Sequence, residues 1–121
     1  MDVQAEKRAL LTGLLGYVDN FEGGVRQTVN LFQAGNIEQA KQHTIEVIDG
    51  LGWIMEGVEV LRELLDIDVT DVKSTLEELQ ISLGNDDDVM TSDIFSNELL
   101  PILGTWKQRM MEVEQHPVSQ G

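Results

Sequence analysis

The sequence contains no cysteine, and only 2 of its 121 residues are proline. The absence of cysteine excludes disulfides, thiolate zinc sites and cysteine nucleophiles, and it is compatible with a reducing cytoplasm. The scarcity of proline leaves long segments in which nothing interrupts a helix. No apolar run approaches the roughly 18 residues that a membrane-spanning helix needs. We therefore expect a soluble, cytoplasmic protein.

Basic residues are also scarce: 8 lysines and arginines stand against 22 acidic residues, a formal net charge of −14. The imbalance is concentrated in residues 59–98, where twelve acids and two basic residues leave −10, and only −4 falls on the rest. Contacts with phosphate groups need clustered lysine and arginine. We therefore expect neither a nucleic acid nor a membrane surface as partner, and a basic protein is favoured.

What the sequence does contain is helical periodicity. Between residues 37 and 65 a core-type side chain returns every three or four positions, which places one face of a helix against a partner. The members of this seam are Ile37, Ala40, Thr44, Val47, Leu51, Ile54, Val58, Leu61 and Leu65. Thr44 is the only polar member.

Three further segments carry stripes of the same kind. They predict helices over about 3–33, from about 70 to Gly84, and from about Asp88 to Val113, where Pro101 predicts a kink or break. Gly35 suits the end of the first helix, and Asn36 with Gln39 resembles a capping box for the second. The predicted fold is an all-α, up-down-up-down four-helix bundle with a kinked fourth helix, formed by a single domain over 1–115, with a flexible tail at 116–121.

Eight of the eleven glycines fall inside these predicted helices, where each costs about 1 kcal/mol relative to alanine. Gly50 and Gly57 flank the seam seven residues apart, and Gly16 and Gly23 repeat that spacing in the first helix. Close helix–helix approach is the favoured explanation, and a shallow groove for a ligand or partner helix is the alternative. Gly23-Gly24 leaves open whether the first helix is continuous.

No catalytic, metal or cofactor motif is specific enough to carry a function. Neither histidine has the Glu-x-x-His spacing of di-iron bundles. The segment from Asp66 to Glu77 lacks the glycine that a calcium loop needs at its sixth position. Nucleophile-elbow and phosphate-loop patterns are absent. We therefore predict that the protein is not an enzyme and holds no cofactor or metal.

A candidate partner surface follows from the residues that the predicted core does not explain. Trp53 lies off the seam of its helix, and exposed aromatic residues on helices are frequent interaction hot spots. The residues assigned to this surface are Trp53, Gly50, Gly57, Asp93, Glu98 and Trp106.

Residues 88–106 resemble a pattern found in small acidic helical proteins of Firmicutes bacteria. The pattern is carried by Asp88, Asp93, Glu98, Pro101-Ile102-Leu103 and Trp106, with Val89 where an aromatic residue is typical. The segments 35–40 and 50–53 are similar as well, so the likeness spans about half the chain. This resemblance implies a helical protein without an assigned activity. In size and helical content the chain also resembles flagellar export chaperones, by analogy alone.

These observations favour a bacterial helical protein that acts through protein–protein contacts, as an adaptor or a chaperone-like binder of a partner segment in a groove between helices. One alternative is a small-molecule or metal-dependent bundle enzyme that uses buried carboxylates such as Asp93 or Glu98. Another is a self-associating structural protein whose seam forms a homodimer interface.

Overall fold

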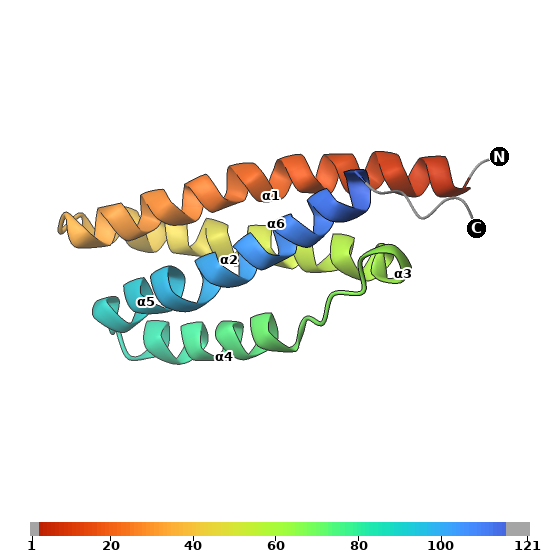
Figure 1. Cartoon of the computed structure of the whole chain (residues 1–121). Coiled ribbons are helices and arrows are strands. Elements are labelled where there is room, and N and C mark those ends of the chain that lie inside the picture. The colour runs from red at the N-terminus through yellow and green to blue at the C-terminus, as the bar shows by residue number, and fades with distance from the viewer. Residues whose placement is uncertain (1–2, 116–121) are drawn as a thin grey trace.

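The computed structural model describes residues 3–115, and within this range the fold is all-α with no strands (Figure 1). The elements in chain order are α1 (Val3–Gln33), α2 (Ile37–Val60), α3 (Arg62–Leu65), α4 (Thr70–Gly84), α5 (Asp88–Ile94), the π-helix η1 (Phe95–Leu99) and α6 (Leu100–Gln115). The four main helices run up, down, up and down, which confirms the predicted fold class. The predicted tail at 116–121 lies outside the described residues.

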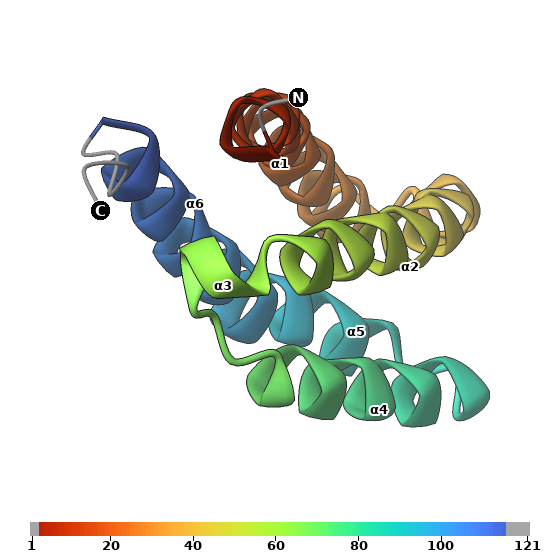
Figure 2. The same cartoon turned by 90° about the vertical axis from the view of Figure 1, so that its right-hand side faces the viewer.

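The other helices cover some sides of α1 and leave another side open (Figure 2). This helix packs against α2 along one side and against α5, η1 and α6 along another. Helix α4 packs mainly on α5 and η1, on the side of the last helix away from α1 (Figures 1 and 2). One outer face of the α1–α2 pair is therefore left without a covering helix.

A tight turn makes α1 and α2 antiparallel. Gly35 ends α1 with φ +83°, a left-handed conformation in which glycine is unstrained. The predicted capping box is wrong, because the side chain of Asn36 makes no capping hydrogen bond. Its backbone makes the connection instead: the N–H donates to the carbonyl of Leu31 and the carbonyl accepts from Ala40, both at 2.9 Å. Helix α1 is continuous through Gly23-Gly24.

The predicted seam of residues 37–65 forms the centre of the core. All of its members are buried except Ile37, which is half-buried, and Leu51 and Ile54 are fully enclosed. Thr44 is tolerated there because its hydroxyl donates to the carbonyl of Ala40 at 2.9 Å. The predicted single helix is interrupted at Leu61, which separates α2 from the short α3. From α6, Nε of Arg109 donates to the carbonyl of Leu65 at 2.8 Å where α3 ends.

The apolar stripe that predicts α4 consists of Val72, Leu76, Leu79 and Leu83, and the face that the helix buries differs from it. Val72 and Leu79 are buried as expected, but Leu76 and Leu83 are only half-buried, and Thr75 and Ser82 are buried in their place. The face is turned toward α5, where the hydroxyls of Ser82 and Thr91 lie 2.8 Å apart. Ser82 also lies 3.0 Å from the carbonyl of Leu79, so its burial leaves no hydroxyl unpaired.

The last helix contains the predicted kink, which takes the form of the π-helix η1. Pro101 has no N–H to donate to the carbonyl of Asn97. The chain accommodates this by widening over η1, where the N–H of Leu100 donates to the carbonyl of Phe95, five residues earlier. The helix therefore continues past Pro101 instead of breaking, and Phe95, Leu99 and the α6 residues that follow stay on the core face.

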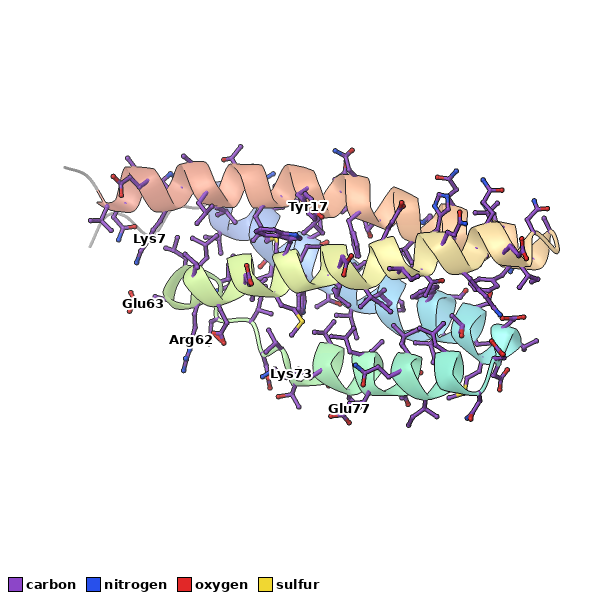
Figure 3. The ribbon with its side chains drawn as sticks, turned by 180° about the vertical axis from the view of Figure 1, so that it is seen from behind. Lys7, Tyr17, Arg62, Glu63, Lys73 and Glu77 are labelled. Carbon is purple, nitrogen blue, oxygen red and sulfur yellow. The ribbon has the colours of Figure 1, made fainter. Side chains whose placement is uncertain are left out.

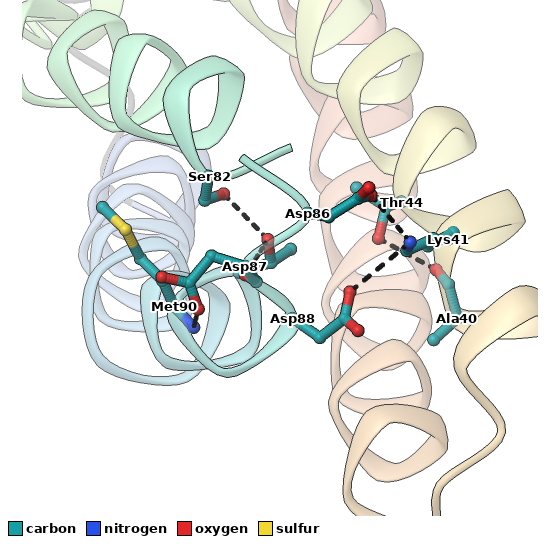
Figure 4. A network of polar contacts seen from close by, with 9 residues as sticks. Ala40, Lys41, Thr44, Ser82, Asp86, Asp87, Asp88 and Met90 are labelled. Carbon is teal, nitrogen blue, oxygen red and sulfur yellow. Dashed lines mark hydrogen bonds and ion pairs between the residues drawn. The ribbon is translucent and has the colours of Figure 1, made fainter. Parts of the chain in front are cut away.

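The connection from α4 to α5 is fixed by acidic side chains (Figure 4). Oδ1 of Asp87 accepts from the backbone N–H of Met90 at 3.0 Å and so caps α5, as the acidic run predicts. Nζ of Lys41, from α2, lies 2.9 Å from Oδ1 of Asp86 and 3.8 Å from Oδ1 of Asp88. The hydrogen bond to Asp86 raises the pKa of Lys41. Part of the acidic charge thus serves to join α2 to this turn.

Candidate partner-binding groove

A groove of about 610 Å³ follows the uncovered face of the α1–α2 pair. It is formed by two stripes of residues, each spaced three, four and seven apart along its helix. The lining residues are Ala9, Leu10, Gly13, Leu14 and Tyr17 of α1, and Trp53, Glu56, Gly57 and Val60 of α2. Figure 3 shows Tyr17 between these two helices in the view from behind.

Large apolar side chains are exposed along this groove. Trp53 is 69% exposed, Val60 62%, and Leu10 and Tyr17 are each 44% exposed. These four account for almost half of the nine large hydrophobic side chains that are exposed in residues 3–115. Single exposed hydrophobic residues are ordinary on protein surfaces, whereas a cluster in a hollow is typical of an interaction site.

Glycines determine the depth of the groove. At Gly57, a Cβ atom would lie 2.9 Å from Cδ1 of Leu14, so a larger residue there would have to displace the Leu14 side chain, and glycine lets α2 approach α1 closely. At Gly13, a Cβ atom would meet nothing within 4 Å, so the missing side chain leaves open space in the groove. Close packing therefore explains Gly57, whereas Gly13 contributes to the hollow.

Gly50 lies beneath the aromatic end of the same face. It is buried, and a Cβ atom there would come within 2.7 Å of Cε1 of Phe21 and 3.1 Å of the hydroxyl oxygen of Tyr17. The rings of Tyr17 and Phe21 are stacked, with centroids 6.3 Å apart and planes at 16°. Gly50 therefore supports the wall of the groove from below and offers no surface itself. At Gly16 and Gly23, nothing lies within 4 Å of a Cβ position, so the packing role predicted for them is wrong.

The side chains that line the groove carry few polar groups. Its lining side chains offer the phenol of Tyr17, the indole N–H of Trp53 and the carboxylate of Glu56. Among the described residues Glu56 has no ion-pair partner. Beyond the end of the groove, Nζ of Lys7 lies 3.5 Å from Oε2 of Glu63. Figure 3 labels both residues at this end of the molecule.

The candidate residues named from the sequence are not brought together. Trp53 and Gly57 line the groove, whereas Asp93 and Glu98 lie around a separate hollow of about 370 Å³ on α5 and η1. Trp106 is only 4% exposed and belongs to the core, which corrects its assignment to a partner surface. Its place on the buried stripe of α6, with Leu103 and Met110 on either side, is the physical reason.

The carboxylates of the rival enzyme interpretation are not buried as it requires. Asp93 is exposed and Glu98 is half-buried. Interaction with Glu78 of α4, together with desolvation, raises the pKa of Glu98, while its Oε1 lies 3.5 Å from the hydroxyl of Thr75. Oε2 of Glu78 is buried and has no hydrogen-bond partner among the described residues. This pair is a point of like-charge contact between α4 and η1.

The deeply buried carboxylate is Glu22, which the sequence analysis missed. Its residue is 3% exposed, and it pairs with Nζ of Lys107 from α6. Lys107 also lies 3.1 Å from Asp19, and the bonds to Glu22 and Asp19 raise the pKa of Lys107. The spacing from Val18 to Glu22 and on to Val25 placed this acid on the buried face and was the available indication.

Within residues 3–115, no group of three or more histidine, aspartate or glutamate side chains is placed to hold a metal ion. No helix in this range is both long and apolar enough to cross a membrane.

Comparisons with known proteins give a family. No curated protein and no solved structure matches this chain. Residues 9–109 match the model of a domain of unknown function, DUF8042, a range that includes both stripes of the groove. Since this match spans most of the chain, the protein belongs to the DUF8042 family.

Proposed function

We propose that this domain acts by protein–protein contact and binds a segment of a partner in the groove between α1 and α2. The observation that carries the proposal is Trp53, a tryptophan 69% exposed at the side of an apolar groove. Burying an apolar ring such as this indole lowers the free energy, so a partner that covers Trp53 would gain that stabilisation. A role as adaptor or as chaperone-like binder, in the cytoplasm, agrees with this arrangement.

The charge of the chain supports a basic partner. The net charge is −14, and Glu56, which has no ion-pair partner within residues 3–115, places a carboxylate inside the groove itself. Complementary charge speeds association and selects among partners. The likeness to small acidic proteins of Firmicutes would place this function in a bacterium.

Cross-linking from a defined position tests the proposal. A photoreactive benzophenone amino acid replaces Val60 in the groove, and Ile81 of α4 is the matched control, since the two are 62% and 58% exposed. We expect the Val60 probe, in cells of the source organism, to cross-link to a specific protein. That adduct should disappear with Trp53→Ala and should not form from Ile81.

Three outcomes would contradict the proposal. Identical adducts from Val60 and Ile81, or none from Val60, would mean that the groove is not used. An adduct from Val60 only to a second copy of this chain would favour the self-associating alternative.

A further inference from the structure

The shape of the groove indicates what kind of segment fits it. Leu10 and Tyr17 are seven residues apart on α1, and Trp53 and Val60 are seven apart on α2. Seven residues of helix rise about 10 Å, so these four side chains border a trough two helical turns long. A third helix, whose side chains recur every three and four residues, matches walls with that repeat.

The polar inventory of the groove argues against an extended segment. An extended chain carries a free N–H and a free C=O at every residue, and each must find a partner when it is buried. Both walls are helices, whose backbone groups are already bonded within the helix, and the lining side chains supply only the three polar groups of Tyr17, Trp53 and Glu56. A helix satisfies its own backbone and needs nothing further from such a groove.

The charge within the groove selects among helices. Glu56 is the single ionisable carboxylate of the lining, and it has no ion-pair partner among the described residues. A second copy of this chain, docked groove to groove, would bring a second Glu56 and another net charge of −14. A helix that carries lysine or arginine would instead supply the missing partner.

We propose, building on the function proposed above, that the occupant of the groove is a basic amphipathic helix of a partner protein. Its apolar residues, three and four apart, pack on Trp53 and over Gly13, and a lysine or arginine beside them pairs with Glu56. An amphipathic strand, a neutral or acidic helix and a second copy of this chain are the competing occupants.

Synthetic peptides test the inference. Three blocked peptides of equal length are compared: a helix-patterned peptide of leucine, alanine and lysine; the same composition rearranged to alternate apolar and basic residues; and the helix pattern with glutamate for lysine. Binding is followed by calorimetry and by the fluorescence of Trp53, with Trp53→Phe to identify its signal against that of the buried Trp106. We expect the basic helix to bind at least tenfold more tightly than either control.

Variants of the protein locate the binding. Gly13→Leu fills the groove, and Gly16→Leu is the matched control: the same change at another exposed glycine of α1, outside the lining. Both replace a glycine with a better helix former, so both should remain folded. Gly13→Leu should weaken the basic helix at least tenfold, and Gly16→Leu should leave it unchanged. Glu56→Gln should weaken it about threefold and reduce its salt dependence, as for an exposed ion pair.

The outcomes separate the two proposals. If the alternating peptide binds as tightly as the helix and Gly13→Leu blocks it, the occupant is not a helix, and the proposed function stands. If the acidic helix binds as tightly as the basic one, the positive charge that we assign to the partner helix is wrong. If no peptide distinguishes Gly13→Leu from Gly16→Leu, the inference is refuted, while cross-linking from Val60 still decides the proposed function independently.

Discussion

Two glycines of α2, two residues apart, should respond in opposite ways to alanine. Gly52 is exposed, and a Cβ atom there would meet nothing within 4 Å. Gly50 is buried, and its Cβ atom would lie 2.7 Å from Cε1 of Phe21. The two substitutions therefore share a helix, a chemistry and a gain in helix propensity, and they differ only in what the new methyl group meets.

The magnitudes follow from these contacts. Alanine in a helix interior is favoured over glycine by about 1 kcal/mol, so Gly52→Ala should raise the free energy of unfolding by about that amount. At Gly50 the same gain is opposed by overpacking, which typically costs about 1–3 kcal/mol. The Phe21 ring cannot yield alone, because it stacks on Tyr17, whose hydroxyl is also only 3.1 Å from the new Cβ. Gly50→Ala should therefore lower the free energy of unfolding by about 1 kcal/mol.

Urea denaturation followed by far-UV circular dichroism measures both variants against the parent protein. A difference of about 2 kcal/mol between them corresponds to roughly 8 °C in Tm for a domain of this size. If Gly50→Ala stabilised the protein as much as Gly52→Ala, α1 and α2 would not approach each other at Phe21 as described. The wall of the groove at Tyr17 would then not be built on close contact with Gly50.

Three other substitutions test polar contacts, each by urea denaturation. Asp87→Ala removes the cap of α5 and should lower the free energy of unfolding by about 1 kcal/mol, whereas asparagine should retain most of it. Lys107→Met leaves Glu22 buried with the exposed Arg26, 3.9 Å away, as its remaining ion-pair partner. It should cost about 2 kcal/mol, less than for a fully enclosed pair, because Lys107 is partly exposed. Glu98→Gln should stabilise the protein near pH 7 and change little near pH 4. The pKa of Glu98 is raised in the folded protein, so the free energy of unfolding of the parent protein falls as the pH rises and this carboxyl ionises, whereas glutamine stays neutral.

Each of these has an outcome that would contradict it. Equal losses for alanine and asparagine at Asp87 would mean that its side chain does not cap the helix. If Lys107→Met cost as much stability in a chain that also carries Glu22→Gln as it does by itself, Glu22 and Lys107 would not be coupled. A gain from Glu98→Gln that stayed the same from pH 4 to pH 8 would exclude the titration of this carboxyl as its cause.

The fold was predictable because the periodicity of apolar residues along a helix can be read from the sequence without knowing how the helices pack. Leu51 and Ile54 recur at the spacing of one helix face, and they are buried whatever packs on that face. The position of Trp53 off this seam likewise predicted its exposure, while Trp106 lies on the buried stripe of α6 and the same rule would have excluded it from the surface.

The site was only partly predictable, because it depends on how two helices are rotated about each other. The sequence places Gly50 beside the seam, but only the approach of Phe21 from α1 shows that a side chain at Gly50 would be obstructed. Leu10 and Tyr17 join Trp53 in one groove only because α1 and α2 turn these stripes toward the same side. A single sequence specifies the repeat along each helix but not the angle between helices.

The openness of the groove is a consequence of where the fourth helical segment goes. In a closed four-helix bundle each helix contacts two neighbours, and the apolar stripes face inward. Here α4 packs on α5 and η1, so α1 is covered by α2 and by the last helix, while the outer side of α1 and α2 receives no helix from residues 3–115. Most of the side chains left there are apolar, and an apolar cluster in a hollow is typical of an interaction site. This is why we propose that a helix supplied by another protein completes the packing of this pair.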